Sequence, residues 1–575
     1  MAKRLLIFVL LIALIVLPAC GTSNTTENTP TNKTDQIADN NSSNEGSSQE
    51  TPDPFGKYEE TVVINIGKSV DPTAKLPDGD THENNQYTRH IKEHLNIEVR
   101  HEWEAASGND YNQKVNLAIA SNDLPDAMVV NNTQFRQAVR AGQLQDLTEA
   151  YDLYASPVMR QMMDKTEGRA QEAVTFDGKM MALPNLPVPD DGYSLMWIRK
   201  DWLDKLGLEV PMTVDEIEEV ARAFVENDPD GNGKDDTVGI IGPQSGGLLY
   251  ANFLSSTNIT YGFGPIFTAH KAFPGFWLKD SDGKIVYGSI LPETKEVLAK
   301  LRDWYEKGLI DKEMGIRKDS SELMSSGQAG IFFGPWWMGY AFSDAVNNNP
   351  DANWQAYASP LDANGEYNTT MGAVSTEFLI VRKDYEYPEA VIKMNNLLIR
   401  DESKFDLSKG GPGFYPLRVP MAAPDESKVT IDALRDVLNG NKEPEDFDDP
   451  AYAPYKLLLN DVENVRDVKL EPYDNTDIQY WDLEARDGAW MRLYSLLVGA
   501  APIYETEMNR VYSEIYYQTK TIESRWANLQ KLEDETFMKI IMGAAPLDEF
   551  DKFVEEWKKQ GGDIITAEVE EAVKE

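Results

Sequence analysis

Short apolar runs and amphipathic stretches alternate along this chain, and that alternation limits its fold more than any other feature. In the first third of the sequence, strands are expected at 62–66, 97–99 and 127–130, and helices at 83–95, 113–120 and 135–141. Strands that alternate with helices predict a mostly parallel sheet covered by helices, with binding loops at the carboxyl ends of the strands.

The same pattern returns after residue 236. Strands are expected at 238–241 and 330–333, and a helix is expected at 292–307. About 520 residues follow the polar N-terminal segment described below, which is more than one hydrophobic core usually holds. We therefore expect an α/β protein with two lobes.

Residues 193–236 carry three signals in succession. The apolar run at 194–198 suits a buried strand. Thr213 and Glu216 then have the T-x-x-E spacing of a capping box, and they open a helix that ends at Asn227. An apolar stripe at helical spacing supports this helix and is formed by Val214, Ile217, Val220, Ala221, Phe224 and Val225.

The loop after this helix, 228–236, places oxygen-bearing side chains at alternate positions with glycines between them. An EF-hand loop takes its calcium ligands from roughly this spacing. The predicted ligands are Asp228, Asp230, Asn232, Lys234 through its carbonyl, and Asp236. Gly239 stands where an EF-hand has its bidentate Glu, so the site is either weaker or takes a ligand from elsewhere. The alternative is a turn that binds no ion, and a bound ion would be structural.

The N-terminus has the pattern of an export signal. Lys3 and Arg4 precede an apolar run at 5–17, which is too short to span a bilayer as a mature helix. The sequence Leu-Pro-Ala-Cys-Gly at 17–21 resembles a lipobox, in which Cys20 becomes the acylated N-terminus of a bacterial lipoprotein. Cys20 is the only cysteine, so disulfides within a monomer are excluded. The alternative is a cleaved signal with an incidental cysteine.

The residues that follow, 22–54, are rich in Asn, Thr, Ser and Glu and predict a disordered tether. The charge balance then limits the partners. The chain has 55 basic and 96 acidic residues and a formal net charge of −41. Nucleic acid and anionic lipid surfaces are poor partners for such a chain, so a covalent membrane anchor is favoured over adsorption. A strongly anionic ligand is disfavoured too, although a local pocket can override the net charge.

Several blocks of the sequence resemble the family 1 extracellular solute-binding lipoproteins of Gram-positive bacteria, which include alginate-binding and maltodextrin-binding proteins. The blocks are YSLMWIRKDWLDKLGLEVPMTVDEIEE, WYEKGLIDKE, AGIFFGPWWMGY, MGAVSTEFLIVRKDYEYPEAV and IIMGAAPLDEFDKFVEEWKKQGG. The resemblance covers nearly the whole mature chain. The loop at 228–236 is similar to the calcium loop of the alginate-binding proteins, although Thr237 stands where they carry an acidic ligand.

The resemblance implies a two-lobed periplasmic-binding-protein-like fold of type II, with a ligand cleft between lobes joined at hinge crossings near Ile198 and Ser375. It also implies a monomeric ABC-transporter receptor on the extracellular face of the cytoplasmic membrane, which delivers an oligosaccharide to a membrane permease and does no chemistry. The expected parts are a signal peptide at 1–19, a lipid-anchored linker at 20–57, an N-terminal lobe at 58–197 and 376–425, and a C-terminal lobe at 198–375 and 426–575.

A sugar site needs aromatic platforms beside hydrogen-bonding groups. Trp336 and Trp337 follow an apolar strand at a loop, and the resemblance implies that Trp336 stacks on sugar. The alternative for Trp336 is packing on the lobe. Further candidates for ligand contact lie in or near loops and are Asn84, Asn85, Trp103, Asn131, Gln134, Tyr250, Trp277, Tyr415 and Trp481. For each of these, the alternative is a role in the core or as a helix cap.

The sequence also leaves open a zinc site and two functional classes other than transport. His90 and His94 lie one helical turn apart with His82 and His101 nearby, so a zinc-binding face is an alternative to the solvated face that we favour. The sequence has no P-loop, H-E-x-x-H, G-x-S-x-G or C-x-x-C motif, so no catalytic residue is predicted. A glycoside hydrolase and a surface adhesin remain the competing classes, since a hydrolase also places aromatic rings and carboxylates around a sugar.

Overall fold

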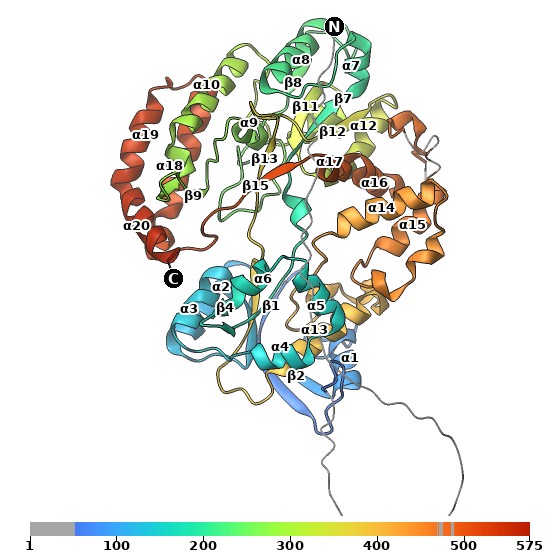
Figure 1. Ribbon diagram of the computed structural model, residues 1–575, viewed down its shortest axis with the longest axis vertical. Coiled ribbons are helices and arrows are strands. Elements are labelled where there is room, and N and C mark those ends of the chain that lie inside the picture. Colours follow the sequence, from blue (N-terminus) through green and yellow to red (C-terminus); the bar gives the residue numbers. More distant parts are fainter. Residues whose placement is uncertain (1–51, 469, 471–474, 485–487, 575) are drawn as a thin grey trace, which may run out of the picture. The chain divides into compact units, whose positions relative to one another are not determined.

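The computed structural model describes residues 52–468, 470, 475–484 and 488–574 (Figure 1). The predicted signal peptide, Cys20 and most of the predicted linker lie outside these described residues. Residues Pro52–Glu575 belong to one compact unit, which contains two separate large sheets. In the described part of the chain, no helix is both long enough and apolar enough to cross a membrane.

The first sheet has five strands in the order β2-β1-β3-β14-β6. They are β1 (Val62–Val70), β2 (Ile97–Ala106), β3 (Ala127–Asn131), β6 (Leu183–Pro184) and β14 (Glu377–Val381). β1 is parallel to β2 and β3, whereas β14 is antiparallel to β3 and β6. The helices that pack with this sheet are α1 (Gln86–Leu95), α2 (Asn109–Ser121), α3 (Asn132–Arg140), α4 (Thr148–Tyr154), α5 (Pro157–Asp164) and α13 (Glu389–Asp401).

The second sheet has four strands in the order β12-β7-β11-β8. They are β7 (Leu195–Arg199), β8 (Val238–Ile240), β11 (Ala329–Gly334) and β12 (Trp354–Tyr357). β7 is antiparallel to both β11 and β12, and β8 is parallel to β11.

The prediction of mostly parallel sheets is confirmed, because every strand but one in each sheet runs in the same direction. β7 and β14 run against their neighbours, and each enters its sheet directly after the chain has crossed from the other sheet, through 185–194 and 371–376 respectively. A strand that arrives this way has no helical crossover on its own sheet, and such crossovers are what make neighbouring strands parallel.

Both faces of the second sheet are buried, as the continuous apolar run of β7 predicts. Met196 and Ile198 pack into one hydrophobic core, whereas Leu195 and Trp197 pack into another on the opposite face. The core on the side of Met196 holds α8 (Val214–Asn227), α10 (Pro292–Glu306), α18 (Lys520–Ile541), α19 (Glu549–Trp557) and α20 (Asp563–Ala572), and Figure 1 shows α10, α18 and α19 side by side. The core on the side of Trp197 holds α12 (Phe342–Asn348), α14 (Glu426–Leu438), α15 (Leu458–Asp467), α16 (Ala489–Tyr494) and α17 (Ala501–Glu505).

Local sequence signals explain where these helices begin. The Thr213 side chain accepts from the Glu216 backbone N–H, and Glu216 Oε2 accepts from the Thr213 N–H at 3.0 Å, which confirms the predicted capping box of α8. The same helix ends at Asn227, and Asp228 takes the left-handed conformation after it, with φ of 45°. At the start of α3, Asn131 and Gln134 cap each other's backbone in the same reciprocal way.

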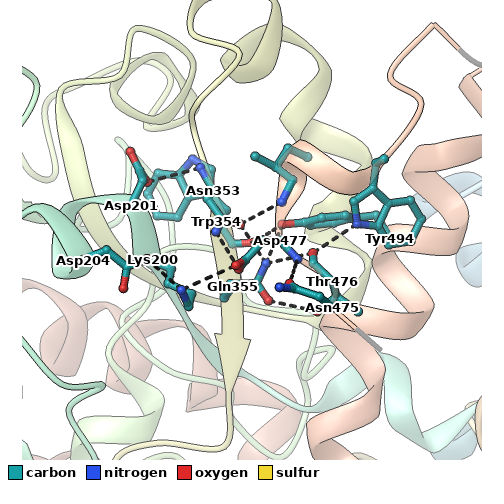
Figure 2. Close-up of polar contacts among 12 residues, drawn as sticks. Lys200, Asp201, Asp204, Asn353, Trp354, Gln355, Asn475, Thr476, Asp477 and Tyr494 are labelled. Carbon is teal, nitrogen blue, oxygen red and sulfur yellow. Dashed lines mark hydrogen bonds and ion pairs between the residues drawn. The ribbon is translucent and has the colours of Figure 1, made fainter. Parts of the chain in front are cut away.

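The two edges of the second sheet are both covered. At one edge, the segment around Asp477 docks on β12 through side chains (Figure 2): Asn353 Nδ2 donates to Asp477 Oδ1 at 2.7 Å, and Gln355 Nε2 donates to the Thr476 carbonyl at 3.1 Å. Lys200 joins the network, because its Nζ lies 3.6 Å from Asp477 Oδ2. At the other edge, the Ile240 N–H of β8 donates to the Leu309 carbonyl at 2.8 Å.

Three segments connect the two sheets, at 185–194, 371–376 and 422–425. The first contains a short 3-10 helix (Pro189–Gly192), and the second contains the predicted hinge residue Ser375. The lobe limits given above stay predictions. We note that β7 begins at Leu195, so the limit expected at 197/198 falls within a strand of the second sheet.

Candidate ligand-binding site

A cavity of about 1030 Å³ lies between segments that belong to the two sheets. The three connecting segments contribute to its lining, with Leu186, Pro187, Val188, Pro189, Asp191, Gly192, Met371, Gly372, Ala373, Val374, Ser375, Thr376 and Pro424. We call the parts of the protein built around the first and the second sheet its two halves. The cavity therefore lies where the chain passes between the halves, and a ligand held there contacts both of them.

The wall on the side of the first sheet is rich in side-chain amides. It is formed by the N-terminal parts of α2 and α3, which follow β2 and β3, and by Asn131 at the end of β3. The residues are Asn109, Asn112, Asn116, Asn131, Asn132, Thr133, Gln134 and Gln137. Gln134 organises part of this wall, because its Nε2 donates to Asn116 Oδ1 at 2.8 Å and to the Asn112 carbonyl at 3.1 Å. Amides placed in this way offer both donors and acceptors to ligand hydroxyls.

The opposite wall combines hydroxyls with aromatic rings. It is formed by Phe253, Leu254, Ser255, Ser256, Thr257, Asn258, Tyr512, Tyr516, Gln518 and Glu523. Tyr516 is fixed, since its hydroxyl donates to the Met371 carbonyl at 2.7 Å. Tyr512 is partly exposed, and its ring lies beside Arg169. Aromatic faces next to hydroxyls and amides suit a ligand that has apolar C–H faces and many hydroxyls.

Two hydrogen bonds join the walls directly. Gln137 Nε2 on α3 donates to Glu523 Oε1 on α18 at 2.8 Å, and the Gln518 N–H donates to Thr133 Oγ1 at 3.1 Å. The guanidinium of Arg136 also lies 3.9 Å from the centre of the Tyr517 ring. These contacts tie α3 to the segment at the start of α18 along one side of the cavity.

Two neighbouring carboxyls lie at the first connecting segment. Asp191 lines the cavity and accepts a hydrogen bond from Trp336 Nε1 at 3.1 Å, and burial raises the pKa of Asp191 above its ordinary value. Asp190 is buried behind it and is bonded to Tyr504. Burial raises the pKa of Asp190 to about 6, against the lowering effect of hydrogen bonds from Tyr504 and Ser427.

Two basic side chains belong to the lining, and they differ in their partners. Lys165 Nζ pairs with Asp425 and lies 5.6 Å from the centre of the Tyr455 ring. Arg169, at the start of α6 (Arg169–Val174), lies over the Tyr512 ring at 4.6 Å, and its Nη2 is 3.6 Å from the exposed carboxylate of Glu167.

The structure places few of the predicted contact residues at this cavity. Asn131 and Gln134 line it. Trp336 is only 8% exposed, packs in the core on the side of Trp197 and reaches the cavity only through its bond to Asp191. Its packing alternative therefore describes its position better than a stacking platform does. Trp337 is partly buried against the same core.

The other predicted aromatic contacts do not line this cavity either. Trp277 and Tyr415 are fully buried, and Trp481 is buried and donates to the Thr476 carbonyl at 3.1 Å. Trp103 packs against the hydrophobic core around the first sheet, next to Gly67. These rings lie in the cores because elements from distant parts of the sequence cover them. Asn84 lies exposed before α1, and Asn85 caps that helix.

Tyr250 has a structural partner instead of a ligand. Its hydroxyl donates to Glu533 Oε1 at 2.6 Å, and the same carboxyl is bonded by Tyr287 at 3.0 Å and Ser289 at 2.7 Å. All four residues are buried. This carboxyl group cross-links α18 to the segments that carry Tyr250 and Tyr287.

Most of the polar wall was not predicted from the sequence, although a signal for part of it exists. Asn109, Asn112 and Asn116 recur at the spacing of one helical face, and all three line the cavity. Tyr512 and Tyr516 follow β15 (Met508–Val511) closely in the chain. Nothing in their local sequence indicates that this segment lies opposite the first sheet across the cavity.

The predicted calcium loop forms a compact turn joining α8 to β8. Asn232 Nδ2 donates to Asp230 Oδ2 and to Asp236 Oδ1, both at 2.8 Å, and the Gly233 N–H donates to Asp228 Oδ2 at 2.9 Å. The other oxygen of Asp228, Oδ1, is buried and has no hydrogen-bond partner. Across the described residues, no group of three or more His, Cys, Asp or Glu side chains is gathered as a metal site.

The same observation bears on the zinc alternative. His90 Nε2 lies 2.8 Å from Asp401 Oδ2, and the His90 and His94 rings pack at 4.0 Å between centres. His101 Nδ1 instead lies 2.7 Å from Glu104 Oε1. These pairings distribute the histidines among separate carboxylates, and they form no metal-ligand group within the described part of the chain.

Comparison with known proteins agrees with this geometry. The family model described as "Bacterial extracellular solute-binding protein" matches residues 82–404, which is more than half of the chain. The chain belongs to this family. The predicted family resemblance is therefore confirmed, and so is the expectation of a binding protein built from two lobes.

Two curated relatives of this solute-binding protein match over different lengths. The polygalacturonan/rhamnogalacturonan-binding protein YtcQ of Bacillus subtilis is 26% identical over 478 residues, which are 80% of this chain and 83% of the relative. The fructooligosaccharide ABC transporter substrate-binding protein FusA of Streptococcus pneumoniae is 29% identical over 237 residues, which are 39% of this chain and 42% of the relative. Among solved structures, the alginate-binding protein AlgQ2 without calcium ion shares the fold with a TM-score of 0.50 at 18% identity, over 90% of this chain and 99% of that chain.

Proposed function

We propose that this solute-binding protein is the receptor of an ABC importer and that it captures an oligosaccharide in the cavity between its halves and delivers it to a membrane permease. The observation that carries the proposal is the composition of the two walls, with amides on one side and hydroxyls and tyrosine rings on the other. The names of YtcQ and FusA, a polysaccharide-binding protein and an ABC transporter substrate-binding protein, support the same ligand class and role.

The size of the cavity also suits such a ligand. Pockets of about 300–1,000 Å³ hold most drug-sized molecules, and this cavity of about 1030 Å³ has room for several sugar rings. Because its lining comes from both halves, each half can contact a different part of one ligand. A ligand shifts the halves toward each other only by its greater affinity for the closed arrangement, and the contacts on the second wall would supply that difference.

The carboxyls of the lining are engaged in ways that favour binding over hydrolysis. A glycoside hydrolase needs one carboxyl as acid and another as nucleophile or base on the two sides of a sugar bond. Here Glu523 accepts from Gln137 and Asp191 accepts from Trp336. We therefore propose that the protein binds its glycan without cleaving it.

The test is calorimetric titration of a glycan panel, with small-angle scattering on any ligand that binds. We expect binding with a fall in the radius of gyration and an unchanged glycan in the recovered sample. Tyr512→Ala should weaken binding at least 10-fold, whereas Tyr340→Ala, an exposed tyrosine outside the cavity lining, should not. Cleavage of the glycan would favour the hydrolase, and binding without compaction would favour the adhesin.

We propose further that the loop from Asp228 to Asp236 binds Ca²⁺ as a structural ion. Its donors are the hard oxygens that Ca²⁺ prefers, from Asp228, Asp230, Asn232, the Lys234 carbonyl and Asp236. The buried and unpartnered Oδ1 of Asp228 suits a cation, because a buried acceptor without a partner is costly. The ion would offset the mutual repulsion of the three carboxylates and hold the turn between α8 and β8. None of these residues lines the cavity, so the ion would act on stability.

We also propose that Cys20 carries the lipid that holds the protein on the extracellular face of the membrane. The lipobox-like sequence around Cys20 supports this, and the membership of an extracellular solute-binding family agrees with it.

A further inference from the structure

Arg169 is the basic side chain of the cavity lining that has no close ion pair among the described residues. The lining contains two basic residues, and the other one, Lys165, is paired with Asp425. Among the described residues, the one carboxylate that pairs with Arg169 is that of Glu167, at 3.6 Å, and it is 83% exposed. Ion pairs so long and so exposed to water contribute little, and a better-placed anion would displace them.

The guanidinium of Arg169 lies against an aromatic ring, and the side chain is still partly accessible. Its guanidinium lies 4.6 Å from the centre of the Tyr512 ring, and both residues line the cavity. The side chain of Arg169 is still 40% exposed. A guanidinium held against an aromatic face keeps its N–H groups at the edge, where two of them can bind the two oxygens of one carboxylate.

The acidic side chains of the lining do not neutralise Arg169. No ion pair joins Arg169 to Asp191 or Glu523 in the described structure; Asp191 accepts from Trp336, and Glu523 accepts from Gln137. The chain as a whole carries a formal charge of −41 and repels anions. An anionic ligand would therefore be recognised through this local cation and against the general field of the protein.

We infer that the ligand carries carboxylates and that Arg169 binds one of them, so the receptor takes an acidic glycan that contains uronic acid residues. This inference rests on the proposed function, because it names the class of oligosaccharide that the same cavity accepts. Arg169 is then the specificity-determining residue that distinguishes a uronic acid from the corresponding neutral sugar.

The test uses pairs of oligosaccharides that differ only in charge. Each acidic oligosaccharide, from polygalacturonate, alginate and glucuronoxylan, is titrated beside the same material with its carboxylates reduced to alcohols. We expect at least one acidic member to bind 10- to 100-fold more tightly than its reduced partner, with a preference that decreases as salt is added.

Substitutions then assign the preference to Arg169. Arg169→Gln should reduce the affinity for the acidic member to that for the neutral one, and Arg169→Lys should retain part of the preference, because it keeps the charge and loses the fork. Arg100→Gln is the matched control, since Arg100 is an exposed arginine of β2 that does not line the cavity. Circular dichroism of each variant establishes that it is folded.

The outcomes separate this inference from the proposed function. If the reduced member of a pair binds as tightly as the acidic one, or if Arg169→Gln keeps the preference, the inference is wrong. If only neutral glycans of a wider array bind, the inference is wrong and the oligosaccharide receptor stands. If no acidic or neutral glycan binds, both are wrong.

Discussion

The buried carboxyl of Glu533 should make the stability of this protein depend on pH, and Glu533→Gln should remove that dependence. Burial raises the pKa of Glu533 from 4.5 to about 7, with the negative charge of Asp534 acting in the same direction. Hydrogen bonds from Tyr250, Ser289 and Tyr287 act against this rise. The neutral acid is thus the form that the folded protein prefers, and glutamine has the same shape as that form.

The sign of the effect follows from where the proton is bound. Between pH 4.5 and about 7 the folded protein holds a proton on Glu533 that the unfolded chain has lost. The stability from this group is therefore complete below pH 4.5 and is lost as the pH rises through about 7. Because each pH unit corresponds to about 1.4 kcal/mol, the loss amounts to about 3 kcal/mol by pH 8.

The assay is thermal unfolding of the wild type and Glu533→Gln between pH 5 and pH 8. We expect nearly equal melting temperatures at pH 5 and a variant that melts about 3 °C higher at pH 8. Asp190 and Glu426, whose pKa values burial raises to about 6 and about 7, stay in both proteins and cancel in the comparison. Glu535→Gln, on the exposed face of the same helix, is the control. Parallel pH profiles for wild type and Glu533→Gln would refute the reasoning.

Three further predictions concern the calcium loop, Trp336 and Cys20. A calcium ion at a hundred times its dissociation constant adds about 2.7 kcal/mol to the free energy of unfolding. Chelator should therefore lower the melting temperature of the wild type but not of Asp230→Ala. Equal melting curves of the wild type with and without chelator would show that the loop binds no ion. Trp336→Ala should cost about 3–5 kcal/mol of stability, as for a core aromatic, whereas Trp336→Phe should lose mainly the hydrogen bond to Asp191; an unchanged denaturation midpoint for Trp336→Ala would contradict this. Cys20→Ala should release the protein into the medium of the producing cells, and a variant that fractionates with membranes would exclude lipid attachment.

Local signals predicted local structure well. The sequence predicted the capping box at Thr213 and Glu216, the end of that helix at Asn227 and the burial of the apolar run that forms β7. Each of these features depends on residues only a few positions apart. The direction of β7 and β14 within their sheets could not be predicted from such signals. It depends on which sheet each strand joins after the chain has crossed between the halves.

The candidate site shows the same limit more clearly. Rings near loops looked available for ligand, but Tyr250 is covered by Glu533 from 283 positions later, and Trp277 packs against Trp557 near the C-terminus. Asn131 could be predicted because a helix cap at the end of a strand is local and is also where α/β cavities open. Arg169 could not, because its stacking partner Tyr512 lies in a segment far along the chain.

The closed edges of the second sheet have a consequence for crowding. An open edge strand presents unpaired N–H and C=O groups that invite a neighbouring molecule to extend the sheet, which is a common route to aggregation. At β12 the docked segment is joined through Asn353 and Gln355 side chains, and at β8 the Ile240 N–H is already bonded. Because both edges are covered, the sheet ends at four strands. Copies of this protein would therefore come close together at high concentration without pairing edge to edge.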